Sequence, residues 1–294
     1  MRAHLESRNP CYRCRDAQGA RVFLKAAVRG DPGVAHERRI LARLESPHVP
    51  RIREASGNLL ALEWLDGKTL WQHRRESKAV VDAEIGAALA RLQVGGRRAA
   101  SQFTVRGDLG KRLLWTSPEL YASLTPSALE LFRQVQQRPA LQALSHLLDR
   151  EADEPTLLVH GDLRQPNVML HRQRITFIDW ELSGLGDPTR DLGMLLAEDV
   201  RAFVQPRDEG EQLTRTRLKA HARALITGWE REAGALGLTL AADHRERIIG
   251  WAGEALLRAG YTIATNEASL SQPLLDAALA MLESPAAWSE ELFT

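Results

Sequence analysis

The sequence predicts an α+β fold with two lobes: a small, β-rich N-terminal lobe over residues 1–66 and a larger, mostly helical C-terminal lobe over residues 67–294. Short runs with strand-like alternation lie in the first of these segments. Apolar residues at helical spacing dominate the second. With 294 residues, of which 44% are hydrophobic, the chain can bury the cores of two lobes.

The N-terminal lobe is expected to contain three strands and a helix. Residues 11–14 form a short strand, and residues 21–28 alternate as a second strand. Residues 34–44 have apolar side chains at helical spacing. Residues 59–70 predict a strand, a glycine-containing turn and the start of a helix.

The C-terminal lobe is expected to consist of helices joined by loops. Gly95 and Gly96 mark the end of the first helix. Pro139 should break or kink the second helix, because proline cannot donate a backbone hydrogen bond. The predicted helices span residues 78–94, 125–149, 190–204, 211–233, 241–264 and 273–283, and the predicted loops span residues 95–111 and 233–239.

Two motifs in the middle of the chain carry the strongest functional signal. Residues 160–167 read His-Gly-Asp-Leu-Arg-Gln-Pro-Asn, and residues 178–181 read Ile-Asp-Trp-Glu. Apolar runs on both sides of the polar turn at residues 171–174 predict a β-hairpin between the motifs. The hairpin would bring Asn167, at the start of one strand, and Asp179, at the end of the other, to one metal cluster.

The spacing of the first motif is that of the catalytic loop of kinases. Asp162 would supply the carboxylate that orients the attacking hydroxyl. Asn167 and Asp179 would supply ligands to Mg²⁺, which prefers hard oxygen donors. Arg164 lies where a guanidinium could stabilise the charge on the transferred phosphoryl group, and a plain surface arginine is the alternative.

A third motif, Gly-Asp-Pro-Thr-Arg-Asp-Leu-Gly at residues 186–193, completes a resemblance to a known family. Together the three motifs resemble those of the aminoglycoside phosphotransferase and choline kinase family. The resemblance spans residues 7–290 and is sharpest at residues 160–193. It implies a protein-kinase-like fold and an enzyme that uses Mg²⁺ and ATP or GTP to phosphorylate a hydroxyl group of a small molecule.

The resemblance also implies roles for residues of the N-terminal lobe. Kinase-like lobes carry a strand lysine that contacts the α- and β-phosphates and a helix glutamate that pairs with it. Lys25 and Glu37 occupy these places in the predicted strand and helix. Glu63, Trp64 and Leu65 would form the hinge strand near the adenine, where backbone groups contact the base.

The phosphate-covering loop departs from the kinase pattern. Its equivalent here, Ser7-Arg8-Asn9-Pro10, contains no glycine. The phosphates would then be held through serine or asparagine side chains and backbone N–H groups. This departure leaves open the nucleotide affinity and the choice between ATP and GTP.

Other residues near the motifs are expected to be structural. His160 should pack and hydrogen-bond the catalytic loop, because Asp162 already supplies the carboxylate. By resemblance, Asp191 ties down the backbone of that loop. Asp187 with Pro188 is expected to cap the next helix.

Composition excludes several classes of function. The net charge of +1 gives no strong attraction to nucleic acid or to acidic membranes. The chain has no apolar run long enough to span a membrane, and its polar N-terminus predicts no signal peptide. Cys11 and Cys14, three apart in a predicted strand, point to opposite faces, which disfavours a disulfide or a metal site. A reduced, cytoplasmic chain is therefore expected.

The acceptor is the least determined part of the prediction. The resemblance places it between the catalytic loop and the C-terminal helices, where carboxylates and aromatic rings would suit an amine or ammonium group. For any single candidate, an ordinary helix-surface acid or core aromatic is the favoured interpretation. The candidate residues are Glu181, Glu198, Asp199, Glu230, Glu254, Trp229, Trp251 and Tyr261.

Three functional classes remain open. A small-molecule O-phosphotransferase is favoured, with an aminoglycoside, macrolide, choline, ethanolamine, sugar or amino alcohol as acceptor. A kinase for serine or threonine of a peptide or protein in a biosynthetic complex is the second, although no A-P-E segment follows Asp179. A pseudokinase is the third; the intact set of Lys25, Asp162, Asn167 and Asp179 argues against it, and the absent glycine-rich loop favours it.

Overall fold

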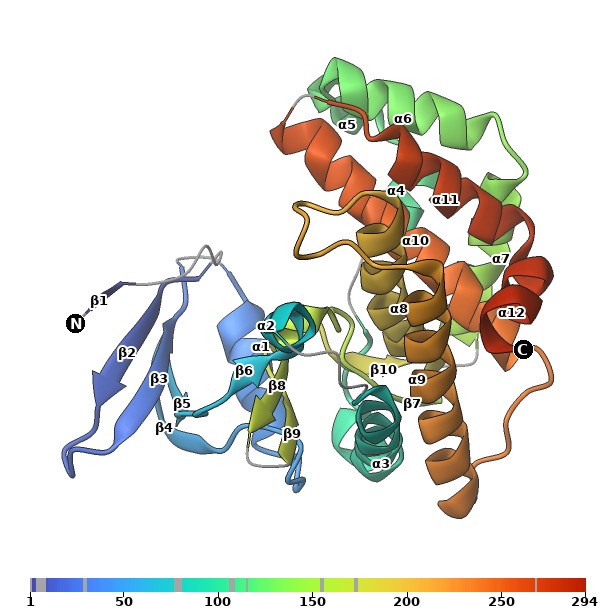
Figure 1. Ribbon diagram of the computed structural model, residues 1–294. Coiled ribbons are helices and arrows are strands. Elements are labelled where there is room, and N and C mark those ends of the chain that lie inside the picture. The colour runs from blue at the N-terminus through green and yellow to red at the C-terminus, as the bar shows by residue number, and fades with distance from the viewer. Residues whose placement is uncertain are drawn as a thin grey trace.

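The chain folds into a small sheet-rich part and a larger helical part, which is the predicted α+β architecture (Figure 1). In Figure 1 the N-terminal sheet lies to one side of the helices from α3 onward, and the hairpin of β8 and β9 lies between them. The computed structural model describes residues 2–3, 9–28, 31–76, 81–105, 109–114, 116–153, 156–171, 174–267 and 269–294.

An antiparallel sheet with the strand order β1-β2-β3-β5-β4 forms the N-terminal part. Lys25 of β3 pairs with Cys11 of β2 on one side and with Leu60 of β5 on the other. Helix α1 (Gly33–Leu41) packs against β4 and β5. The strands are β1 (Arg2–Ala3), β2 (Cys11–Arg15), β3 (Arg21–Ala26), β4 (Ile52–Ser56) and β5 (Leu59–Glu63).

The three strands and the helix predicted for this part are confirmed, with small differences at their ends. Strand β4 had no prediction. Its residues 53–56 are all exposed, so it lacks the apolar alternation by which a strand is recognised in a sequence. It exists because its backbone pairs with β5.

Two small sheets connect the N-terminal sheet to the helices. The predicted hairpin is confirmed as β8 paired with β9, and β6 pairs with the other edge of β8. Residues 172–173 of the predicted turn lie outside the described residues. The strands are β6 (Lys68–Thr69), β7 (Leu157–Val159), β8 (Val168–His171), β9 (Arg174–Phe177) and β10 (Gly184–Gly186), with β7 paired to β10.

The helical part is built on two long helix contacts. Helix α3 packs along α9, and α10 packs against α8 and α11. Trp180, Trp229 and Trp251 are among its largest fully buried side chains. The helices are α2 (Leu70–Glu76), α3 (Asp82–Ala100), α4 (Leu109–Leu114), α5 (Pro118–Ser123), α6 (Pro126–Gln136), α7 (Ala140–Asp153), α8 (Thr189–Val204), α9 (Arg215–Ala235), α10 (His244–Asn266), α11 (Gln272–Glu283) and α12 (Pro285–Phe293).

Helix α3 corrects one prediction. It continues through Gly95 and Gly96 to Ala100, so the predicted helix end and the first part of the predicted loop at 95–111 are wrong. A Cβ on Gly96 would meet the Leu158 side chain at 2.3 Å. The burial of this face outweighs the cost of glycine in a helix, about 1 kcal/mol. Residues 77–80, where the helix was predicted to start, lie outside the described residues.

The other helix predictions are confirmed. The segment at 125–149 is interrupted between α6 and α7, and Pro139 lies in the interruption. Helices α8, α9, α10 and α11 match the remaining predicted segments, with differences of a few residues at their ends. Helices α5 and α12 had no prediction, and α4 begins at Leu109, so the end of the predicted loop at 95–111 is also wrong.

Helices α3 and α9 approach each other at two glycines. A Cβ on Gly86 would lie 2.1 Å from the carbonyl oxygen of Leu225, and one on Gly228 would lie 2.1 Å from that of Ala83. Neither oxygen can move without its helix. The contact therefore fixes the distance between α3 and α9.

Gly86→Ala is expected to lower the free energy of unfolding by about 1–3 kcal/mol, because the added methyl group overpacks the contact with α9. Gly95→Ala, on the same helix, is the matched control. A Cβ there meets nothing within 4 Å, so this variant should gain up to about 1 kcal/mol. Chemical denaturation measures both. Equal gains in stability would show that α3 and α9 are not in close contact.

Candidate active site

The catalytic loop runs from the end of β7 to the start of β8. The backbone N–H of Ile178 donates to the Asn167 carbonyl at 2.9 Å. The Asn167 side-chain Nδ2 donates to the Asp162 carbonyl at 2.8 Å. Gly161 has a φ of +80°, which favours glycine. These contacts hold Asp162 and Asn167 beside the end of the hairpin.

Asp191 also holds the catalytic loop in place. Its Oδ2 accepts from the backbone N–H of His160 at 2.9 Å, and its Oδ1 accepts from that of Gly161 at 3.1 Å. Burial raises the pKa of Asp191, although His160 and the backbone donors oppose this. The expectation that Asp191 ties down the loop is confirmed.

His160 is part of the packing, as expected. Its Nε2 lies 2.9 Å from the carbonyl oxygen of Ile178, and its ring centroid lies 4.6 Å from that of Trp180. The indole Nε1 of Trp180 donates to the Phe177 carbonyl at 2.8 Å. His160 therefore links the catalytic loop to the segment that carries Asp179.

Asp191→Asn is expected to lower kcat by about 10- to 100-fold, because an amide cannot accept from both backbone donors and the loop will shift. Nucleotide affinity should change much less. Steady-state kinetics and a nucleotide titration measure the two effects. Asp276→Asn, at an exposed acid of α11, is the control. An unchanged kcat in Asp191→Asn would contradict the positioning role.

Lys25 is the centre of a charged cluster between the N-terminal sheet and the catalytic hairpin. The lysine is only 4% exposed. Its Nζ lies 2.8 Å from Glu37 Oε2, 2.6 Å from Asp179 Oδ1 and 2.6 Å from Glu181 Oε1. Burial lowers the pKa of Lys25, but the three carboxylates hold it above the usual range. The predicted pairing of Lys25 with Glu37 is confirmed.

Glu37 connects this cluster to the backbone after β9. Its Oε1 accepts from the backbone N–H of Trp180 at 3.2 Å. Burial raises the pKa of Glu37, and the Lys25 ammonium opposes this. Helix α1 is therefore tied both to β3 and to the Asp179 segment.

Asp179 has an unusual backbone conformation. Its φ is +70°, the only positive value among the described residues that are not glycine. Such conformations cost free energy and occur often at functional sites. Here the turn directs the carboxylate of Asp179 to Lys25, and that of Glu181 to the same atom.

Glu181, one of the acceptor candidates, lies in the Lys25 cluster. It contacts Lys25 and the buried Asn9, and a place in the acceptor pocket stays a prediction. Asn9 Nδ2 donates to Glu181 Oε1 at 2.9 Å and to Asp31 Oδ2 at 3.3 Å. Ser7 and Arg8 of the predicted phosphate loop lie outside the described residues.

The site contains oxygen donors that suit a divalent cation. Carboxylate oxygens of Glu37, Asp179 and Glu181 lie within 4.8 Å of one another. Asn167 donates through its amide nitrogen, so its amide oxygen is the atom left for a metal. Carboxylate and amide oxygens are ligands that Mg²⁺ accepts, and the predicted pair of Asn167 and Asp179 fits this chemistry.

Arg164 contacts the predicted catalytic carboxylate. Its Nε and Nη2 lie 3.2 Å and 3.0 Å from Asp162 Oδ2. The Arg164 side chain is half exposed and that of Asp162 is 21% exposed. Arg164 therefore fixes one carboxylate oxygen, and its contact with a transferred phosphoryl group stays a prediction.

The side chains of two predicted hinge residues, Glu63 and Trp64, contact other residues of the chain. Glu63 Oε1 accepts from Arg174 Nη2 of β9 at 3.0 Å. Trp64 donates to Asp66 at 2.8 Å, and the Arg13 guanidinium lies 5.2 Å from its ring centroid. Glu63 and Trp64 would thus contact a base through backbone groups, and this contact, like that of the neighbouring Leu65, stays a prediction.

Trp229 and Trp251 do not form the walls of a pocket. Each is at most 1% exposed. Their indole nitrogens donate to Gln93 Oε1 at 2.8 Å and to Asp187 Oδ2 at 3.3 Å. The interpretation of both as core aromatics is therefore confirmed. Tyr261 packs its ring 5.8 Å from that of Phe132.

The candidate acceptor carboxylates are mostly neutralised by arginines. Asp199 is buried and accepts from Arg74 Nη2 at 2.9 Å and from Gln165 Nε2 at 2.8 Å. Glu230 accepts from Arg245 Nε at 2.7 Å. Burial raises the pKa of the half-buried Glu198. Asp199 and Glu230 are therefore each paired with an arginine.

Asp187 also differs from its predicted role in one respect. Its Oδ1 accepts from the backbone N–H of Thr189 at 3.0 Å, at the start of α8, so it does satisfy a helix N-terminus. Its Oδ2 lies 3.1 Å from Arg247 of α10. Asp187 therefore joins α8 to α10 as well as capping α8.

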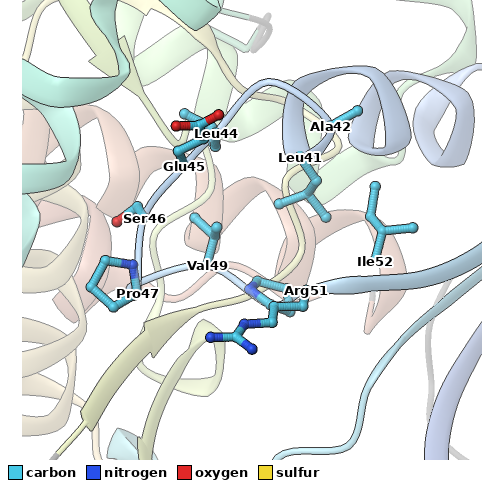
Figure 2. A pocket seen from close by; sticks show the side chains of 10 residues that line it. Leu41, Ala42, Leu44, Glu45, Ser46, Pro47, Val49, Arg51 and Ile52 are labelled. Carbon is cyan, nitrogen blue, oxygen red and sulfur yellow. The ribbon is translucent and has the colours of Figure 1, made fainter.

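A hollow of about 580 Å³ lies elsewhere, beside the end of α1 and the start of β4 (Figure 2). None of the candidate catalytic or metal residues lines it. It is bordered by Leu41, Ala42, Leu44, Glu45, Ser46, Pro47, Val49, Pro50, Arg51 and Ile52.

No helix among the described residues combines the length and the apolar character needed to cross a membrane.

Comparison with known families matches residues 4–235 to the model of a family described as the phosphotransferase enzyme family. A comparison with curated protein sequences gave no significant match.

Several solved structures share the fold. A choline/ethanolamine kinase family protein from Mesorhizobium loti is 18% identical with a TM-score of 0.62, over 99% of this chain and 90% of that one. The macrolide 2′-phosphotransferase from Brachybacterium faecium is 19% identical with a TM-score of 0.54, over 96% and 91%. An amicoumacin kinase in complex with AMP-PNP and Ca²⁺ is 16% identical with a TM-score of 0.58, over 97% and 87%. These likenesses show the kinase-like fold.

Proposed function

We propose that the phosphate donor of this chain is a Mg²⁺-bound nucleoside triphosphate. The premise is that the chain belongs to the phosphotransferase enzyme family. It is a small-molecule kinase with an alcohol group as acceptor. The observation that carries this proposal is the contact of Lys25 with both Glu37 and Asp179. These contacts of Lys25 connect the N-terminal sheet, α1 and the catalytic hairpin. Phosphoryl transfer from a nucleotide needs these three elements close together.

The charge of the cluster supports a cation at this place. Three carboxylates surround a single ammonium group, so an excess of negative charge remains. Asn167 and Asp179 would hold the ion, and Lys25 would contact the α- and β-phosphates. A bound Mg²⁺ would neutralise charge that develops on the phosphate oxygens.

Asp162 would act on the acceptor. Its carboxylate would accept a hydrogen bond from the acceptor hydroxyl and direct the oxygen at the γ-phosphate. Arg164 holds the other carboxylate oxygen, which limits the rotation of the Asp162 side chain. Asp191 and His160 keep the loop backbone in place.

The test is phosphate transfer from γ-labelled ATP and GTP, with and without Mg²⁺, read by product mass. The acceptor panel contains aminoglycosides, macrolides, amino alcohols, sugars, hydroxy acids and Ser/Thr peptides. Addition of one phosphate to a small molecule, dependent on Mg²⁺, is the expected result. Transfer to the peptides alone would favour the peptide-kinase alternative, and a chain that binds no nucleotide would contradict the proposal.

A further inference from the structure

Asp162 has one carboxylate oxygen that is left for the acceptor. Its Oδ2 accepts from Arg164, whereas among the described residues no side chain donates to its Oδ1. The acceptor hydroxyl would therefore donate to Oδ1. The group that faces this oxygen decides which acceptors fit.

Arg258 of α10 is the charged group next to that oxygen. Its Nη1 lies 4.0 Å from Asp162 Oδ1, beyond hydrogen-bonding distance, and its side chain is 25% exposed. Its Nη2 donates to Glu254 Oε2 at 3.0 Å. Within the described part of the chain, Nη1 has no hydrogen-bond acceptor, so it can donate to a ligand.

The Glu254 carboxylate accepts from Nη2 of Arg258 and leaves Nη1 for a ligand. Glu254 is only 3% exposed. It also acts on the Arg190 guanidinium: burial lowers the pKa of Arg190, and Glu151, its partner at 2.6 Å, together with Glu254 holds that pKa above its usual value. Burial raises the pKa of Glu198, which after Asp162 is the next acid whose charge acts on Arg164.

We propose that Arg258 binds an anionic group of the acceptor, so that the small molecule phosphorylated at Asp162 is a hydroxy acid or the phosphate ester of a polyol. This inference rests on the proposed function and names its substrate class. A carboxylate or a phosphate would accept from Nη1 in a charge-assisted hydrogen bond.

The geometry limits where the anionic group lies. The acceptor oxygen would lie about 3 Å from Oδ1, and Nη1 lies 4.0 Å from the same atom. The reacting oxygen and Nη1 are then at most about 7 Å apart. An anionic group one or two carbons from the hydroxyl carbon fits this distance.

The test compares acceptors that differ in charge, with Mg²⁺ and whichever of ATP and GTP the wild-type chain binds. The pairs are glycolate with ethanolamine, glucuronate with glucosamine, and glycerol 3-phosphate with glycerol. We expect the anionic member of at least one pair to have a kcat/KM about 10-fold or more above its partner. The first two pairs report a carboxylate and the third a phosphate.

Arg258→Gln should lower kcat/KM for the anionic acceptor by about 10- to 100-fold more than for glycerol. Arg245→Gln is the matched control, because Arg245 lies on the same helix and is also paired with a glutamate. It lies about 20 Å away along α10. Wild-type values are expected for it.

A second variant controls for misfolding, because Arg258→Gln leaves Glu254 without its Arg258 partner. In the double variant Glu254→Gln/Arg258→Gln both charges are absent, and the same selective loss is expected. Preference for the cationic or neutral members, or no transfer to the anionic ones, would overturn the inference. An equal loss for all acceptors would also overturn it and assign Arg258 to the transferred phosphate. Failure of the wild-type chain to bind Mg²⁺-nucleotide would instead contradict the proposed function.

Discussion

Asp162→Asn is expected to reduce phosphate transfer by about 10³-fold, within the range that a positioned general base contributes. Nucleotide affinity should stay almost unchanged. The carboxylate of Asp162 contacts Arg164 and faces Arg258, while Lys25 contacts Asp179 and not Asp162. The asparagine keeps the size of the side chain but cannot accept a proton.

The measurement combines kcat with a titration of AMP-PNP in the presence of Mg²⁺. Asp149→Asn, at an exposed acid of α7, controls for the loss of one negative charge. Wild-type turnover in Asp162→Asn would show that another group orients the acceptor. Loss of nucleotide affinity in the same variant would place Asp162 on the donor side.

Asp179→Asn is expected to remove the Mg²⁺-dependent part of nucleotide binding, a loss of about 100-fold or more. The Asp179 carboxylate contacts Lys25 at 2.6 Å and is one of the predicted Mg²⁺ ligands. Asparagine tolerates the positive φ of this position. Asp179→Asn therefore tests the loss of the carboxylate charge without disturbing the turn.

Asp179→Ala serves as the comparison, because alanine loses the ligand and also fits the turn poorly. Calorimetric titration of AMP-PNP with and without Mg²⁺ measures the effect in both variants. Both should lose the increment due to Mg²⁺, and Asp179→Ala should also unfold at a lower temperature. Equal Mg²⁺-nucleotide affinity in Asp179→Asn and the wild-type chain would rule out Asp179 as a metal ligand.

The sequence predicted the catalytic loop and the hairpin because their residues are close along the chain. The motif at residues 160–167 fixes the loop, and two apolar runs around a polar turn fix β8 and β9. The pairing of Lys25 with Glu37 came from the family resemblance, and the clearly patterned strand and helix identified the two residues. A short local signal was sufficient in each case.

Side-chain directions after Asp179 could not be predicted in the same way. The positive φ of Asp179 turns the chain, and Glu181 therefore reaches Lys25. Nothing in the residue types shows this turn. Glu181 would have been found only from its position two residues after the predicted metal ligand.

Contacts between helices that are far apart in the sequence could not be predicted either. Arg258 comes near Asp162 because α10 packs against α8, and no motif surrounds it. Residue type alone makes Trp229 and Trp251 candidate walls, whereas their burial depends on how α9 and α10 pack. The end of α3 was misplaced because glycine usually marks a helix end, and here packing against Leu158 overrides that preference.

A single-turnover experiment shows where the γ-phosphate goes. Wild-type chain and Asp162→Asn are each mixed with γ-labelled Mg²⁺-nucleotide and the acceptor found in the panel, and labelled acceptor and free phosphate are quantified. We expect label on the acceptor with the wild-type chain and almost none with the variant. Label that appears only as free phosphate, or equal transfer by both proteins, would contradict this expectation.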